Sequence, residues 1–271
     1  MSVYNNEDPE LLYEAFRSIL NQTILPTEFV LIEDGKINIY LNKVIIWFTN
    51  ASHDKGILVK IIKNPKNIGL GLSLRKGVLE SNYNWIARFD SDDVNDIHRM
   101  EKTLNYINNH NKVAIVGGYA AEFNKNIKST NPIRKVPSEQ KEIYKMSKFR
   151  NPFNHMTVTL NRECVLAAGN YENVPYFEDY YLWLKIISQK RSLFNLKKIL
   201  VYAHVDDRFY YKRSGLNYFR KELNFQLMAY NNKLINLRTL IFNTIIRGPI
   251  RVFPKFLLKV VYKLLRYKSV Y

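Results

Sequence analysis

Two periodicities of hydrophobic residues alternate along the first half of the chain. Short apolar runs predict strands within 1–9, 28–35, 56–64, 83–90 and 112–123. Apolar residues spaced three and four positions apart predict helices at 8–22, 69–81 and 97–107. Strands that alternate with helices predict an α/β fold with a mainly parallel central sheet flanked by helices.

The second half of the chain continues this pattern. Residues 155–171 predict a strand and then a short helix that Gly169 ends. Residues 176–189 predict a helix, with Glu178 and Asp179 in its first turn. With 46% hydrophobic residues among 271, the chain can bury a sizeable core, which excludes wholesale disorder.

The charge is concentrated at the C-terminal end. The formal net charge is +17, and residues 216–271 hold eleven Lys or Arg against one acid, Glu222. We therefore expect one domain over 1–215 and a basic helical extension over 216–271. Such a charge asymmetry favours an anionic partner, either nucleic acid or a phospholipid surface.

Residues 246–271 place apolar and basic side chains on different faces of a predicted helix. A basic amphipathic helix of this kind is typical of segments that lie in a membrane interface. The alternative is a helix that packs on the domain and leaves its basic face in water.

Three further features concern the compartment. The lone Cys164 excludes an intrachain disulfide and suits a reducing compartment. The opening residues lack the pattern of a signal peptide, and no apolar run approaches the roughly 18 residues of a membrane span. We therefore expect a cytoplasmic protein, peripheral on the inner face of the cell membrane.

Polar residues follow three of the predicted strands, at 4–6, 33–35 and 90–93. The carboxyl ends of parallel strands meet at one edge of a sheet, where ligands bind. Asp90 and Asp92 alternate, so they can face the same side, and clustered carboxylates suit a hard cation such as Mg²⁺ or Mn²⁺. The alternative is an Asp-rich turn in which Asp93 or Asp96 caps the helix at 97–107.

The motifs of this chain resemble those of glycosyltransferase family 2, the inverting enzymes with the two-lobed GT-A fold. The matching segments occur in the family's order: "MSVYNNEDPELLYEAFRSILNQT", "PTEFVLIEDG", "NIGLGLSLRKG", "ARFDSDD" and "YFEDYYLWLK". The chain is most similar to the enzymes that assemble bacterial capsules, exopolysaccharides and O-antigens, such as the amylovoran type. The resemblance covers roughly residues 1–215.

The resemblance implies a role for each matching donor-side residue. Tyr4 would lie near the nucleotide base, and Asp34 would accept a hydrogen bond from the base imino group. Asn67 and Gly69 would shape the loop near the nucleotide. Asp90 would contact the ribose or support the metal.

On the catalytic side, the resemblance implies that Asp92 ligates a divalent cation that bridges the two phosphates. Asp179 would be the general base, and Glu178 would position the sugar or the loop. Asn154 and His155 would face the acceptor, although a structural histidine is the alternative. His204, Lys212 and Arg213 are candidate phosphate contacts, with solvated side chains as their alternative.

Two positions depart from the family pattern. Many relatives carry Arg-Asn where this chain has Leu74 and Arg75, so Arg75 is shifted by one position as a nucleotide contact. Met1 falls inside the expected first strand, which is therefore either short or begins upstream.

The function that the sequence favours is a metal-dependent inverting hexosyltransferase. It would move galactose, glucose or an N-acetylhexosamine from a nucleoside diphosphate sugar, with UDP favoured, to a lipid-linked saccharide. One alternative, a nucleotidyltransferase, usually has a Gly-rich basic loop after the first strand, where this chain has "YNNEDPELL". The other, a nucleic-acid-binding protein, is opposed by the acids at the strand ends, so we expect no nucleic acid partner.

Overall fold

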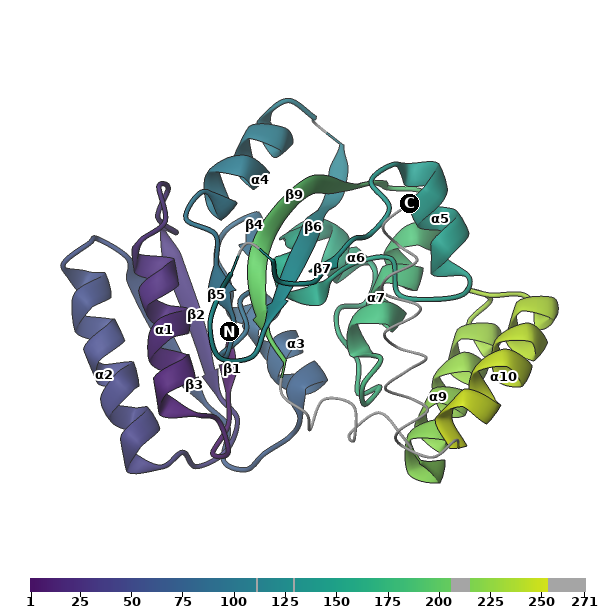
Figure 1. The fold of residues 1–271 in the computed structure, drawn as a ribbon, viewed down its shortest axis with the longest axis horizontal. Coiled ribbons are helices and arrows are strands. Elements are labelled where there is room, and N and C mark those ends of the chain that lie inside the picture. Colours follow the sequence, from purple (N-terminus) through teal and green to yellow (C-terminus); the bar gives the residue numbers. More distant parts are fainter. Residues whose placement is uncertain (111, 129, 206–214, 253–271) are drawn as a thin grey trace.

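The structure is a computed structural model that describes residues 1–110, 112–128, 130–205 and 215–252. Lys212, Arg213 and the part of the predicted basic helix that follows residue 252 lie outside the described residues. Figure 1 shows an elongated α/β molecule, with helices α1 and α2 at one end and helices α9 and α10 at the other.

The N-terminal sheet is parallel, as the sequence predicts. It contains β1 (Ser2–Val3), β2 (Glu28–Glu33) and β3 (Leu58–Lys63), in that order. Val3 pairs with Glu33, and Glu33 pairs with Lys63, so the three strands end at the same level. The loops that follow these strands therefore emerge side by side.

Three helices accompany this sheet: α1 (Pro9–Leu20), α2 (Ile39–His53) and α3 (Leu70–Glu80). The rings of Phe16, Phe29 and Phe48 form the centre of the core between α1, α2 and β2; the Phe16 and Phe48 centroids lie 3.9 Å apart. The sequence pattern did not predict α2. Asn38 is the N-cap of this helix. Its side-chain oxygen accepts hydrogen bonds from the backbone N–H groups of Tyr40 and Leu41, both at 3.0 Å.

The second sheet is mixed. Its strands are β4 (Trp85–Ala87), β5 (Val94–Asn95), β6 (Val113–Phe123), β7 (Ile133–Arg134), β8 (Thr159–Asn161) and β9 (Ser192–His204). The order is β4-β8-β6-β9-β5, with β7 paired to β6. Only β6 and β9 run parallel among these described strands, so the expected parallel arrangement describes the first sheet better than the second.

The helices of this half are α4 (Arg99–Asn108), α5 (Gln140–Ser147), the 3₁₀ helix η1 (His155–Thr157), α6 (Arg162–Ala167) and α7 (Glu178–Ser188). Gly169 follows α6 with a φ of 84°, which is the left-handed turn that the sequence suggests. Helix α7 begins with Glu178 and Asp179, as predicted, and buries Trp183 completely in the core.

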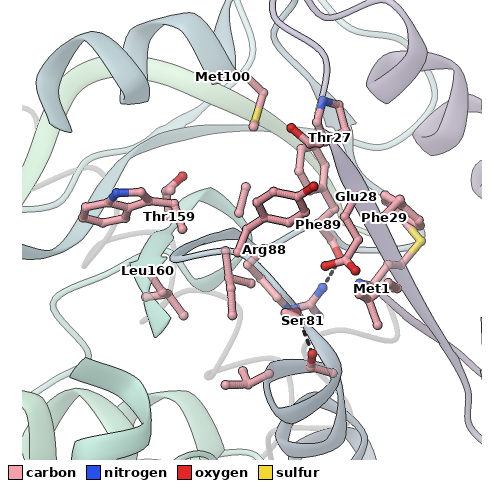
Figure 2. A pocket seen from close by; sticks show the side chains of 18 of the residues that line it. Met1, Thr27, Glu28, Phe29, Ser81, Arg88, Phe89, Met100, Thr159 and Leu160 are labelled. Atoms are coloured by element: carbon pink, nitrogen blue, oxygen red, sulfur yellow. Dashed lines mark hydrogen bonds between the residues drawn. The ribbon is translucent and has the colours of Figure 1, made fainter. Parts of the chain in front are cut away.

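A cavity of about 470 Å³ lies between β2 and β4. Thr159 and Leu160 line it on one side and Met1 and Phe29 on the other, as Figure 2 shows. Its lining is mainly apolar, and none of the site residues predicted from the sequence is among the described residues that form it. Arg88 connects the cavity to the acidic turn that follows β4.

The C-terminal extension begins with a helical hairpin, α9 (Leu216–Asn231) and α10 (Leu237–Val252). Its buried face packs against α7, where the rings of Phe225 and Phe177 stack 4.8 Å apart. Buried Glu222 forms an ion pair with Arg247 and so joins α9 to α10. Within the described part of the chain, no helix is both long and apolar enough to cross a bilayer.

The hairpin provides a test of whether residues from 216 onward are an independent extension. Phe225→Ala should lower the free energy of unfolding by about 3–5 kcal/mol, because the ring is fully buried against α7. The matched control Phe242→Ala, at a side chain that is 50% exposed, should cost about 1 kcal/mol. Urea denaturation of both variants measures this, and equal losses would show that α9 contributes no core to the domain.

Candidate active site

Asp34 links the end of β2 to the start of α3. Its carboxylate is buried and accepts hydrogen bonds from the backbone N–H groups of Ile68 at 2.8 Å and Gly69 at 3.0 Å. Asn64 donates to the same carboxylate at 3.1 Å. Asp34 thus fixes the loop that carries Asn67 and Gly69. A carboxylate is favourable at this place because it lies beside the N-terminus of α3.

The neighbouring strand end approaches the same loop. The backbone N–H of Asp34 donates to Val3 at 2.8 Å, so Tyr4 lies beside Asp34. Gly35 has a φ of 90°, and a Cβ there would lie 2.8 Å from the backbone nitrogen of Asn67. The structure therefore brings Tyr4, Asp34, Asn67 and Gly69 together on adjoining loops.

A cluster of charges follows β4. Arg88 is buried and forms an ion pair with Asp90, two residues further along the extended chain. Arg99, which is fully buried, donates to the carbonyl of Arg88 and to Asn95, both at 2.5 Å. Its guanidinium lies 4.2 Å from the centre of the Phe89 ring. Burial lowers the pKa of Arg99 to about 9, although Asp90 opposes the shift.

The acidic side chains of this turn separate into different roles. Asp92 remains beside Asp90, and burial together with the charge of Asp90 raises the pKa of Asp92 to about 6. Asp93 is buried and accepts a hydrogen bond from the backbone N–H of His204 at 2.9 Å. Its second oxygen has no hydrogen-bond partner among the described residues, and burial raises its pKa well above the ordinary value.

Neither Asp93 nor Asp96 is the N-cap of α4: that position is His98, whose side chain makes no capping hydrogen bond, and Asp96 instead belongs to the turn before the helix. Its carboxylate accepts from the backbone N–H of His98 at 3.1 Å, just before α4, and also binds Lys102 at 2.5 Å. Asp93 instead points into the fold toward β9. The turn before α4 and the proposed metal site therefore use different carboxylates.

The donor set at this turn fits a hard divalent cation that its substrate helps to hold. Among the described residues, no three His, Cys, Asp or Glu side chains converge to form a complete metal cage. Mg²⁺ and Mn²⁺ are commonly held by one or two carboxylates together with substrate phosphates. Asp90 and Asp92 offer such a pair, and the pKa of Asp92 is raised by burial and then by repulsion from Asp90, which a cation would offset.

The candidate base lies at the start of α7. Asn151 donates to one carboxylate oxygen of Asp179 at 2.6 Å, and the backbone N–H of Tyr180 donates to the other at 2.6 Å. These two bonds fix the orientation of a half-buried carboxylate. Glu178 is buried. A Cβ added at Gly71 would lie 3.1 Å from the Cβ of Glu178, so α7 and α3 begin side by side.

His155 lies within electrostatic reach of both the candidate base and the acidic turn. Its ring nitrogen Nε2 lies 2.9 Å from the hydroxyl of Tyr171. Burial lowers the pKa of His155, while the charges of Asp179 and Asp90 act in the opposite direction and Arg88 adds to the decrease. Since Asp179 and Asp90 both act on this ring, the structure brings the two carboxylates to the same region.

Two candidates have their polar atoms engaged with the backbone. The side-chain amide of Asn154 donates to the carbonyls of Gly118 at 2.9 Å and Arg134 at 3.1 Å, which secures η1 to the second sheet. Arg75 donates to the carbonyl of Gly169 at 2.9 Å and thereby holds the loop before α7. These bonds give Arg75 a structural role, in keeping with its shifted position in the motif.

Sequence reasoning missed four residues that support the site: Arg88, Arg99, Asn151 and Tyr171. Arg88 had a local signal: it lies two positions before Asp90, and side chains two positions apart on an extended strand point to the same side. Arg99, Asn151 and Tyr171 had no such signal. Their partners Arg88, Asp179 and His155 lie in other segments of the chain, and only folding brings them together.

The comparisons with known proteins agree with this geometry. The family model described as "Glycosyl transferase family 2" matches residues 1–169, which is more than half of the chain. The chain belongs to glycosyltransferase family 2. The resemblance inferred from the motifs is therefore confirmed, and the protein is a glycosyltransferase.

Other members of family 2 are similar over most of this chain. An uncharacterized glycosyltransferase of Haemophilus influenzae is 36% identical, over 97% of this chain and 96% of the relative. The amylovoran biosynthesis glycosyltransferase AmsE of Erwinia amylovora is 33% identical, over 82% and 81%. An Escherichia coli UDP-Gal:α-D-GlcNAc-diphosphoundecaprenol β-1,3-galactosyltransferase is 32% identical, over 97% and 94%.

Solved structures of low sequence identity share the fold. S. aureus TarS, in complex with UDP-GlcNAc, has a TM-score of 0.62 at 12% identity, over 83% of this chain and 65% of that one. The mannosyltransferase PcManGT of Pyrobaculum calidifontis, in complex with GDP-Man and Mn²⁺, has a TM-score of 0.57 at 12% identity, over 97% and 79%. The predicted GT-A fold is confirmed.

The buried histidine gives a pH-dependent prediction. The folded state resists protonation of His155, whereas the unfolded chain protonates it near pH 6.5. The free energy of unfolding should therefore fall as the pH falls below 6.5, by at most about 1.4 kcal/mol per pH unit from this group.

His155→Gln removes the titrating ring but keeps a side chain that can hydrogen-bond to Tyr171. Urea denaturation of both proteins near pH 7.5 and near pH 5 should show a smaller loss of stability for the variant. If both proteins lost the same stability on acidification, the histidine would not be held neutral by the fold.

Proposed function

We propose that this enzyme is a metal-dependent inverting hexosyltransferase. It transfers galactose, glucose or an N-acetylhexosamine from a nucleoside diphosphate sugar, with UDP as the favoured nucleotide, to a lipid-linked saccharide in surface polysaccharide synthesis. The observation that carries the proposal is the proximity of Asp90 to Asp92 on one side and, together with Asp179, to His155 and Tyr171 on the other.

The donor side of the proposal rests on the loops at the ends of β1, β2 and β4. The nucleoside would lie against Tyr4 and the loop that Asp34 fixes, and Asp90 would contact the ribose. Asp34 can still accept from a base through Oδ2, which accepts a hydrogen bond from Gly69 and has a second lone pair, whereas Oδ1 already accepts from Asn64 and Ile68. The UDP-Gal named for the Escherichia coli relative and the UDP-GlcNAc bound to TarS support a UDP-linked donor.

A divalent cation held by Asp90 and Asp92 would stabilise the negative charge that develops on the departing diphosphate. Asp179 would accept the proton of the acceptor hydroxyl. The hydroxyl oxygen would then form a bond to the anomeric carbon as the bond from that carbon to the diphosphate oxygen breaks on the opposite face. Asn151 keeps Asp179 in the orientation that this proton transfer requires.

The acceptor side lies at the start of α7, where Glu178 would position the sugar. A lipid-linked acceptor is supported by the diphosphoundecaprenol substrate named for the Escherichia coli relative. The AmsE relative supports a role in capsule, exopolysaccharide or O-antigen synthesis. An acceptor in the membrane and the eleven basic residues within 216–271 suit an enzyme that is peripheral on the inner face of the cell membrane.

Replacement of the carboxylates tests the assignment. Asp179→Asn should lower kcat by about 10²–10⁴-fold, because the amide cannot accept the proton. Asp92→Ala should abolish the stimulation of turnover by Mn²⁺ or Mg²⁺. Release of nucleoside diphosphate from a panel of UDP- and GDP-sugars, with each cation in turn, measures both effects and identifies the donor.

Asp96→Asn is the matched control, since Asp96 belongs to the same acidic turn but binds Lys102 and the start of α4. Its turnover should stay close to that of the wild type. Wild-type turnover in both Asp179→Asn and Asp92→Ala would show that these carboxylates do not form the active site.

A further inference from the structure

Helix α10 exposes an apolar stripe on the surface. Five side chains, each between 49% and 63% exposed, form this stripe: Leu237, Ile241, Phe242, Ile245 and Ile246. Positions 237, 241 and 245 are separated by one helical turn, so their side chains follow one another along the same face. Single exposed apolar residues are common on proteins, but a contiguous stripe of large ones marks an interaction surface.

The opposite face of α10 is already occupied. Leu240 and Asn243 are buried; Leu240 packs in the cluster that α9 shares with α7, and Asn243 donates to Gln226 of α9 at 3.0 Å. The apolar stripe is therefore not required for the contact with α9. In Figure 1 the hairpin forms one end of the molecule, with α10 on its outer side.

The exposed charges of the hairpin that carries the stripe have one sign. Arg220, Lys233 and Arg238 of the hairpin are exposed. The single acid of the hairpin, Glu222, is buried and paired with Arg247. Among the described residues from 216 to 247, the surface thus combines large apolar side chains with cations and exposes no carboxylate.

We propose that this face of α10 docks on an anionic lipid leaflet. A helix that lies in the membrane interface buries an apolar face among the acyl chains and places basic side chains at the anionic headgroups. A second copy of the chain fits less well, because a symmetric contact would bring the Arg238 and Lys233 side chains of two cationic surfaces together. We therefore assign the negative charge that faces the basic side chains of the hairpin to the lipid headgroups.

The docking face is firmly connected to the catalytic helix. Asn243 donates to the carbonyl of Lys148 at 2.9 Å, and Arg247 donates to that of Phe149 at 2.7 Å. Tyr180, which follows the candidate base directly, donates to the carbonyl of Ser147 at 2.7 Å. The end of α5 thus joins α10 to the start of α7.

This connection has a consequence that rests on the proposed lipid-linked acceptor. Docking through α10 would hold the start of α7, and with it Asp179, at a fixed orientation to the membrane that contains the acceptor. The docking itself does not depend on the identity of the donor or the acceptor, so it can be measured separately.

The double variant Ile241→Ser, Ile245→Ser tests the docking face in the full chain. Sedimentation with vesicles of phosphatidylglycerol and phosphatidylcholine should show wild-type binding and about a tenfold or greater loss in the variant. The matched control Ile46→Ser, Leu58→Ser replaces two side chains that are 52% and 59% exposed near the other end of the molecule, and it should bind like the wild type.

Three results would overturn the proposal. The first is wild-type binding by the Ile241→Ser, Ile245→Ser variant. The second is an equal loss in the control variant. The third is a change from dimer to monomer in size-exclusion chromatography of the Ile241→Ser, Ile245→Ser variant, with vesicle binding unchanged, which would assign the stripe to a second copy of the chain.

Donor turnover without vesicles separates this proposal from the proposed function. The Ile241→Ser, Ile245→Ser variant should release nucleoside diphosphate at the wild-type rate, because the stripe does not contact the site. A wild-type protein that binds vesicles but turns over no donor would contradict the proposed function and leave the docking face supported.

Discussion

The burial of several charges at the end of β4 is the constraint on which the site depends. Isolated buried charges cost several kcal/mol each unless they are paired and hydrogen-bonded. Arg88 pairs with Asp90, and Arg99 donates to the backbone of Arg88 while it lies over Phe89. For Asp92, burial and the charge of Asp90 outweigh the opposing effects of His204, a backbone hydrogen bond and Arg88, and its pKa rises to about 6. This residual repulsion suits a turn that binds a divalent cation and a diphosphate.

The loops around this turn are held by hydrogen bonds between side chains and loop backbones. Asp34 fixes the loop before α3, and Arg75 fixes the loop before α7. Gly71 lets these two segments approach, because a Cβ there would lie 2.6 Å from the carbonyl oxygen of Glu172. These contacts join the loop before α3 to the start of α7, and in the proposed mechanism such preorganisation would lower the cost of reaching the transition state.

The parts of the fold that the sequence predicted are those with a local cause. Strand β2 is a short apolar run, and α7 shows helical spacing behind two acids. Strand β9 was missed because buried Asn195 and exposed Lys197 interrupt its apolar alternation; the side-chain NH₂ group of Asn195 donates to the carbonyls of two distant prolines. The predicted site residues came from motifs, whereas Arg99 was missed because its partner carbonyls come from other elements of the fold. Sequence patterns report periodicity and motif order, but they do not report which distant backbone groups a buried side chain satisfies.

The central claim is that Asp90 and Asp92 hold a divalent cation that bridges the diphosphate of the donor. Calorimetric titration of UDP into the enzyme, with and without Mn²⁺, tests this claim directly for the wild type and for Asp92→Asn. The account predicts that Mn²⁺ strengthens UDP binding by about tenfold or more in the wild type and has little effect in the variant. The same strengthening by Mn²⁺ in both proteins would contradict it.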